Sequence, residues 1–136
     1  MRLMLSTVLA TVLSAGVTSA AQALPPLSEQ VEINQGLTAI TIADMIRHNC
    51  KSIDARLLRA FGYMRTLKQM ATDAGYSDDE IEAFVTDKAE KARVKDAARA
   101  WLVAHGVVLD DGQSYCPVGL AEIEGKTAIG VLLRAD

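Results

Sequence analysis

Apolar residues recur at intervals of three and four along most of the chain, which is the spacing of one face of an α-helix. The first such helix is expected over residues 34–49. A second is expected to start after Ser52 and to end at Ala74, because the following Gly75 favours a helix stop. The predicted buried stripe of this second helix consists of Ile53, Leu57, Phe61, Met64, Leu67 and Ala71. No segment is predicted to be a β-strand.

Capping signals divide the rest of the chain into further helices. Ser77 and Glu80 form a capping box, so a third helix is expected to begin there. Residues 87–90 repeat the form of the box and predict a break near Thr86, with one continuous helix as the alternative. The fourth helix is expected to end at His105, directly before a glycine.

Two short helices are expected near the C-terminus. Ser114 is placed to cap one that carries Cys116, and Gly125 is placed to stop it. Thr127 is placed to cap the last, which holds three large apolar residues. The predicted fold class is therefore all-α, a small bundle of five or six helices.

The first 23 residues have the layout of a secretory signal peptide. One basic residue, Arg2, precedes an apolar run, and small residues occupy the positions at 21 and 23 that signal peptidase reads. We expect cleavage after Ala23, which leaves an extended leader over residues 24–33 and one helical domain over residues 34–136. A retained membrane anchor is the alternative. After cleavage no stable membrane span is expected.

Composition narrows the class of protein. The 136-residue chain is 50% hydrophobic and 23% charged, and removing residues 1–23 leaves 13 basic and 17 acidic residues. A chain of this length and composition is a single domain, and it is neither disordered nor a basic nucleic-acid binder. The phosphate-loop and dinucleotide-binding motifs do not occur in it. We therefore expect no cofactor and no nucleic-acid partner.

The chain has two cysteines, Cys50 and Cys116, and both lie in the part expected to be exported. An even pair in an oxidising compartment predicts a disulfide. Such a bond would close a long loop and stabilise the small domain by about 4 kcal/mol. An intermolecular bridge and free thiols are the alternatives.

Few residues suggest catalysis or metal binding. Thr41, Asp44 and His48 share one helix face, where an Asp–His pair can orient a general base for a hydroxyl nucleophile. A surface charge pair explains the same spacing. The second histidine, His105, and the two cysteines lack the paired spacing of zinc ligands. We therefore expect neither an enzyme nor a metal site.

Two features favour a binding partner instead. The first predicted helix is apolar on nearly all sides, which suits either a central core helix or one covered by another surface. Charge is also segregated: residues 47–68 carry six basic residues against one acidic, and residues 69–90 carry seven acidic against one basic. This arrangement can steer a partner, with a solvated bipolar surface as the alternative. The predicted partner surface consists of Leu37, Ile40, Met45, Arg47, Lys51, Arg56 and Arg59.

Several short motifs are shared with a known family. They are residues 46–50 (IRHNC), 75–77 (GYS), 101–102 (WL), 115–116 (YC) with Gly119 and Glu122, and 129–134 (IGVLLR). On these motifs the chain resembles a family of small exported alphaproteobacterial proteins classed as a domain of unknown function. The resemblance covers nearly the whole mature chain. It implies a periplasmic helical domain with a Cys50–Cys116 bond, and it supplies no catalytic residues.

These observations lead to one expected function and two alternatives. We expect a non-enzymatic periplasmic protein that binds another protein of the cell envelope or serves it as an accessory. One alternative is an acid-stress holdase, because the acidic region of the third helix would lose charge at low pH. The other is a small-ligand-binding domain. The partner's identity and the oligomeric state stay open.

Overall fold

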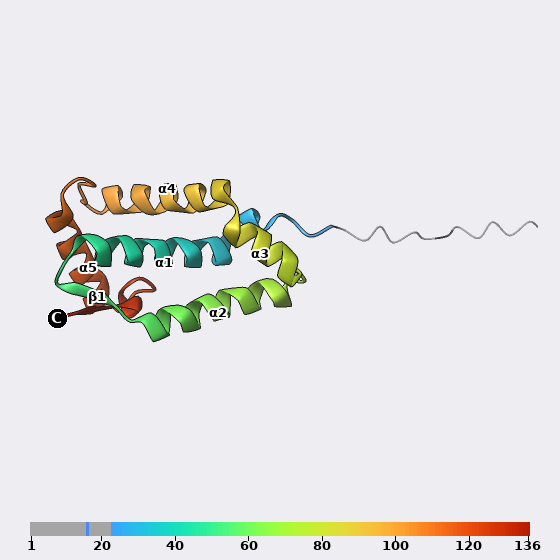
Figure 1. Cartoon of the computed structure of the whole chain (residues 1–136), viewed down its shortest axis with the longest axis horizontal. Helices are drawn as coiled ribbons and strands as arrows, with labels where there is room; N and C mark the ends of the chain where they lie inside the picture. Colours follow the sequence, from blue (N-terminus) through green and yellow to red (C-terminus); the bar gives the residue numbers. More distant parts are fainter. Residues whose placement is uncertain (1–15, 17–22) are drawn as a thin grey trace, which may run out of the picture.

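The computed structural model describes Gly16 and residues 23–136, which form five α-helices (Figure 1). The predicted signal peptide, apart from Gly16 and Ala23, lies outside the described residues. The helices are α1 (Val31–Asn49), α2 (Leu57–Asp73), α3 (Asp78–Thr86), α4 (Lys88–Ala104) and α5 (Tyr115–Glu124). The prediction of a small helical bundle is confirmed. None of these described helices is long and apolar enough to cross a membrane.

The smaller elements are three single turns of 3-10 helix and one pair of short strands. The turns are η1 (Leu27–Glu29), η2 (Gly112–Ser114) and η3 (Gly130–Leu132). Strand β1 (Ile53–Ala55) pairs antiparallel with β2 (Leu133–Ala135).

This two-stranded sheet corrects the prediction that the chain has no strand. Helical spacing predicts residues 53–55 in the second helix and Leu133 in the last one. The structure pairs Ile53 with Ala135 and Ala55 with Leu133. Ile53 and Leu133 are almost fully buried, so the pairing also adds apolar contacts to the core. Local spacing cannot reveal a pairing between segments almost 80 residues apart.

The predicted extended leader is also too long. Helix α1 begins at Val31, three residues earlier than expected, and η1 precedes it. Leu27 and Ile33 are buried in a small apolar cluster with Tyr76, which draws this segment onto the fold. The side-chain amide of Asn34 secures the turn by donating to the Leu27 carbonyl at 2.8 Å.

Local capping signals are confirmed where α3 and α4 begin. The Ser77 hydroxyl accepts from the Glu80 N–H at 3.1 Å, and the Glu80 carboxylate accepts from the Ser77 N–H at 2.7 Å. The predicted break follows Thr86, where the Asp87 carboxylate accepts from the Glu90 N–H at 2.8 Å.

Ser114 is the N-cap residue of α5, as predicted, but its side chain does not form the capping hydrogen bond. Its hydroxyl instead accepts from the Val108 N–H and donates to the backbone, which fixes the loop before α5. The predicted final helix is reduced to η3. Ile129, not Thr127, is the N-cap residue of this turn, although the Thr127 hydroxyl accepts from the Gly130 N–H at 3.0 Å.

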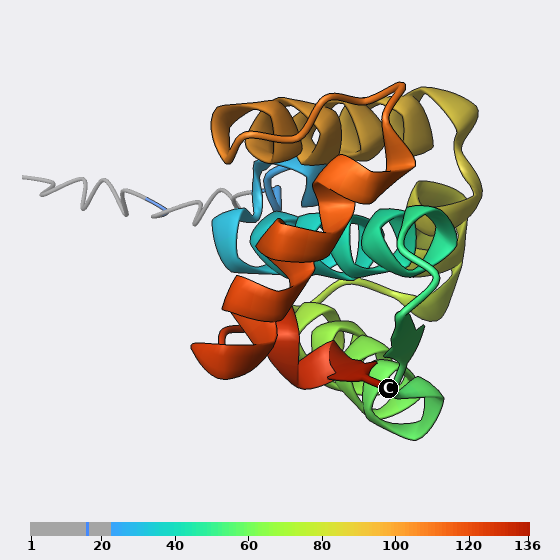
Figure 2. The ribbon, with the colours of Figure 1, turned by 90° about the vertical axis from the view of Figure 1, so that its left-hand side faces the viewer.

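Helix α1 is the central element of the fold. Helices α4 and α2 lie on opposite sides of it (Figure 1), and α5 crosses it near its C-terminal end (Figure 2). The main core forms around α1 and contains the largest fully buried side chains, namely Ile42, Ile46, Ile53, Leu102, Tyr115 and Leu133. A helix surrounded in this way must be apolar on several sides, as its sequence is.

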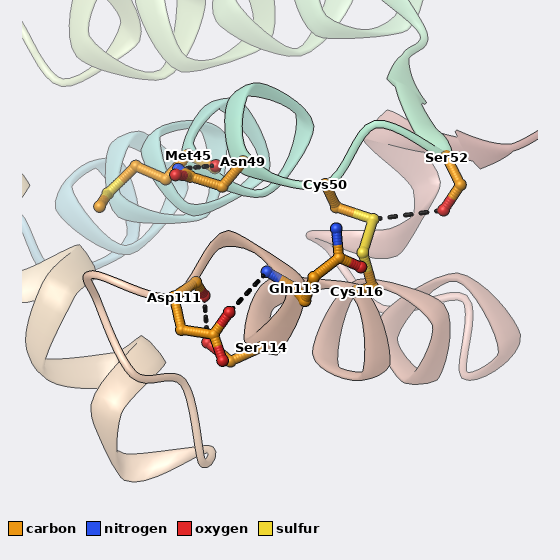
Figure 3. Close-up of a disulfide and its surroundings, with 8 residues drawn as sticks. All are labelled: Met45, Asn49, Cys50, Ser52, Asp111, Gln113, Ser114 and Cys116. Atoms are coloured by element: carbon orange, nitrogen blue, oxygen red, sulfur yellow. Dashed lines mark hydrogen bonds between the residues drawn. A yellow bond between two sulfur atoms is a disulfide. The ribbon is translucent and has the colours of Figure 1, made fainter.

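The predicted disulfide joins Cys50, at the C-terminal end of α1, to Cys116 in the first turn of α5 (Figure 3). Their Cα atoms are 5.2 Å apart, and Cys50 is fully buried. The Ser52 hydroxyl lies 3.3 Å from the Cys50 sulfur. A disulfide of this kind indicates an oxidising, non-cytoplasmic environment.

We predict that replacing both cysteines (Cys50→Ala with Cys116→Ala) lowers the free energy of unfolding by about 4 kcal/mol, because the unfolded chain regains the entropy of a long open loop. Urea denaturation of the oxidised protein and the variant measures this. Reductant added to the wild type is the control and should produce a similar loss. An unchanged unfolding midpoint would contradict the prediction.

We also predict opposite effects of alanine at two glycines. A Cβ at Gly130 would overlap the backbone carbonyl of Glu122, so Gly130→Ala should destabilise the fold by about 3 kcal/mol. A Cβ at Gly62, in the middle of α2, meets no atom within 4 Å, so Gly62→Ala should stabilise by about 0.5–1 kcal/mol through helix propensity. Thermal unfolding of both variants tests the pair, and equal shifts would refute the packing argument.

Candidate binding groove

An apolar groove of about 260 Å³ lies between α2 and α4. Helix α1 forms its floor, and α3, which links α2 to α4, closes one end (Figure 1). Its lining residues are Leu37, Ile40, Thr41, Met64, Phe84, Val85, Glu90, Lys91, Val94 and Lys95. A smaller cavity of about 80 Å³ shares several of these side chains and extends the lining to Ile33 and Leu67.

The floor of the groove is mainly hydrocarbon. Leu37 and Ile40 are half-buried, so each keeps part of its side chain open to the groove. Thr41 is also half-buried, and its hydroxyl donates to the Leu37 carbonyl at 2.8 Å. The one polar floor side chain is therefore already hydrogen-bonded within α1.

Helix α2 carries an exposed apolar stripe, and Met64 is the member of it that lines the groove. Leu57, Phe61 and Met64 are 57%, 57% and 49% exposed, and their spacing of four and three places them on one side of the helix. The prediction that these three are buried is wrong, whereas Leu67 and Ala71 are buried as predicted. Large apolar residues gathered in one patch beside a groove are typical of an interaction surface.

The α4 wall is basic. Lys91 and Lys95 line the groove one helical turn apart, and neither forms an ion pair with any residue of 23–136. Glu90 also lines the groove, but its carboxylate contacts the Arg93 guanidinium at 2.8 Å. The unpaired charge along this wall is therefore positive.

The apolar residues of the predicted partner surface lie in two different places in the structure. Leu37 and Ile40 line the groove, as a contact surface requires. Met45 instead packs against the main core. The sequence prediction omitted Phe61 and Met64 because it assigned them to the core. The sequence feature that could have identified these two residues is the width of the apolar face of α2, which is broader than one neighbouring helix covers.

The basic members of the predicted surface lie elsewhere. Arg47 is exposed and contacts the Asp44 carboxylate at 2.7 Å. Arg56 and Arg59 line a different depression, beside α5 and η3, where the Arg56 side chain donates to the Leu133 carbonyl at 3.1 Å. Lys51 is exposed in the turn after α1 and, like Arg47, is not among the groove-lining residues.

The residues considered for catalysis share a helix face but do not form a nucleophile–base pair. The Thr41 hydroxyl donates to the Leu37 carbonyl, and the Asp44 carboxylate contacts Arg47. His48 Nδ1 lies 2.8 Å from the Asp44 carbonyl and 3.5 Å from its carboxylate. This arrangement matches the surface charge pair that the sequence offered as the alternative.

Other polar features lie away from the groove. The His105 ring stacks on Trp101 with ring centroids 3.6 Å apart, and Trp101 lines a cleft of about 640 Å³ beside α1 and residues 127–129. Burial raises the pKa of the Tyr115 hydroxyl, which Arg99 partly offsets. In the part of the chain that the structure describes, no three His, Cys, Asp or Glu side chains gather as metal ligands would.

Comparison with known proteins places the chain in a family but not in a functional class. No curated protein and no solved structure matches it. One family model does match, and it spans residues 25–134, which is nearly all of the described structure. This chain therefore belongs to the family of unknown function DUF5333.

Proposed function

We propose that this protein is exported to the periplasm and acts there as a non-enzymatic binding protein for another protein of the cell envelope. The observation that carries the proposal is the exposed stripe of Leu57, Phe61 and Met64 on α2, which joins the apolar groove at Met64. The stripe continues into Val85 of α3, which is 41% exposed. Covering this surface removes large apolar side chains from water.

Burying the stripe would supply part of the free energy that a specific contact needs. Complete burial of one large apolar side chain contributes about 1.5–3 kcal/mol, and each of Leu57, Phe61 and Met64 still exposes about half of its surface. Together they offer a few kcal/mol before the cost of association is counted. Specificity must then come from shape and from charged groups at the rim.

Export is supported by two independent features. The layout of residues 1–23 is that of a signal peptide, and the Cys50–Cys116 disulfide requires an oxidising compartment to persist. The disulfide also ties α1, the floor of the groove, to α5. A groove built on such a tied helix is in place before a partner arrives, which lowers the ordering cost of binding.

An acid-stress holdase is the second candidate, because a holdase also needs exposed apolar surface. The specific observation in its favour is the exposed acidic start of α3, close to the groove, where Asp78, Asp79 and Glu80 gather in the first turn. A holdase contacts many unfolded clients, whereas an accessory protein contacts one folded partner.

Export can be tested directly. We predict that protein recovered from the periplasm without reductant has the mass of residues 24–136 less two hydrogens, since cleavage follows Ala23 and both cysteines are oxidised. Mass spectrometry with and without reductant measures both features. Recovery of the full-length chain in the membrane fraction would contradict the cleavage and support a retained anchor.

We predict that a photo-crosslinking residue in place of Phe61 forms one discrete adduct in living cells, because this side chain lies at the centre of the exposed stripe. The matched control is Val103, which is 54% exposed on α4 and belongs neither to the groove lining nor to the α2 stripe. A crosslinker there should give no such adduct. Met64→Asp should weaken the Phe61 adduct by placing a charge in the contact.

The outcomes separate the candidate functions. No adduct from Phe61, or the same adducts from Phe61 and Val103, would refute a binding function for the groove. Many adducts that form only at acidic pH would support the holdase instead.

A further inference from the structure

We infer that the occupant of the groove is an amphipathic helix of the partner protein, with acidic residues on both sides of its apolar face. The inference rests on the proposed function and adds the chemistry of the partner. Three observations carry it: the form of the groove, the spacing of its apolar wall, and the sign of the charge along its rim.

The form of the groove favours a helix over an extended peptide. Its floor and both long walls are α-helices, whose interior backbone groups are already hydrogen-bonded. An extended peptide gains affinity by pairing with a free sheet edge, and the β1–β2 pair is not part of the groove lining. Apolar side chains projecting from a helix fit walls of this kind.

The spacing of the α2 wall sets the pattern of the partner's anchors. Leu57, Phe61 and Met64 span eight residues of α2, a length of about 10 Å, and Met64 lines the groove. A partner helix with apolar residues at positions i, i+3 or i+4, and i+7 presents anchors over the same length. Leu37 and Ile40 of the floor then meet the centre of that apolar face.

The charge along the rim of the groove determines which charged residues the partner helix should carry beside its apolar face. Lys91 and Lys95 stand on the α4 side without an acidic partner in residues 23–136, and Lys68 lines the adjoining cavity on the α2 side. Lys68 contacts the Asp78 carboxylate only across 3.5 Å at an exposed position. Basic groups along both walls attract a helix that is acidic on both flanks.

The same charges argue against two other occupants. A second copy of this chain, docked groove to groove, would bring Lys91 and Lys95 against their own equivalents, and like charges oppose such a contact. A flat anionic lipid surface would also meet Asp78, Asp79 and Glu82, which are exposed on α3 and would repel it, whereas a helix seated in the groove lies beside Lys91 and Lys95.

The test uses three synthetic helical peptides of about 18 residues, or five helical turns. Two share the same apolar face and differ in glutamate or lysine flanks, and the third keeps the glutamates but scrambles the apolar positions. Fluorescence anisotropy with the oxidised protein should show that the glutamate-flanked peptide binds at least about tenfold more tightly than the other two. This preference should weaken as salt screens the rim charges.

Charge reversal on α4 locates the contact. Lys91→Glu with Lys95→Glu should weaken binding of the glutamate-flanked peptide about tenfold and strengthen binding of the lysine-flanked one. The matched control is Lys51→Glu with Lys126→Glu, which changes the net charge equally at two exposed lysines outside the groove. Circular dichroism of both variants confirms that they fold.

Each remaining outcome overturns the inference. These outcomes are no binding of the glutamate-flanked peptide, equal binding of the two flank types, equal effects of both double variants, binding to anionic vesicles instead, and a dimer that Phe61→Asp separates. The first three of these outcomes leave the proposed function standing if the cellular Phe61 adduct still forms. In that case only the partner's chemistry is wrong. Without that adduct, the proposed function itself fails.

Discussion

The crossing of α5 over α1 is the contact on which the rest of the structure depends. Gly119 permits it, because a Cβ at that position would overlap Ile46 and Ile53, and the Cys50–Cys116 bond fixes it covalently. With α5 on this side, α4 and α2 occupy two further sides of α1. The strip of α1 left between α2 and α4 becomes the groove floor. The contact that stabilises the core therefore also leaves one part of the central helix open.

Sequence predicted those features that are decided within a few residues. Ser77 and Glu80 mark the start of α3 because the capping box is a local exchange of hydrogen bonds. The disulfide was also predictable, since two cysteines in an exported chain allow one internal pairing. The strands were not, because pairing of Ile53 with Ala135 depends on how α5 and η3 return the chain to the end of α1. Tertiary packing therefore determined the secondary structure of these two segments and overrode their local helical spacing.

The groove was predictable only in part, for a different reason. Leu37 and Ile40 were recognised because α1 has more apolar faces than one neighbour can cover. Phe61 and Met64 were assigned to the core because helical periodicity describes an apolar face without saying what covers it. On α2, Leu67 and Ala71 are buried, whereas Leu57 and Phe61 are more than half exposed. A helix whose apolar face is too wide for one neighbouring helix to cover can therefore be a central helix or a helix with an open binding face.

The apolar and the basic residues of the groove would contribute differently to the selection of a partner. The floor and the α2 wall are apolar and rest on a helix held by a disulfide, so they supply affinity with little ordering cost. They do not discriminate strongly between apolar helices, because such contacts are non-directional. Lys91 and Lys95, on long exposed side chains, add little affinity each but penalise a partner with basic flanks. Selection in the periplasm would then depend on the flanks of the partner helix more than on the identity of its apolar anchors.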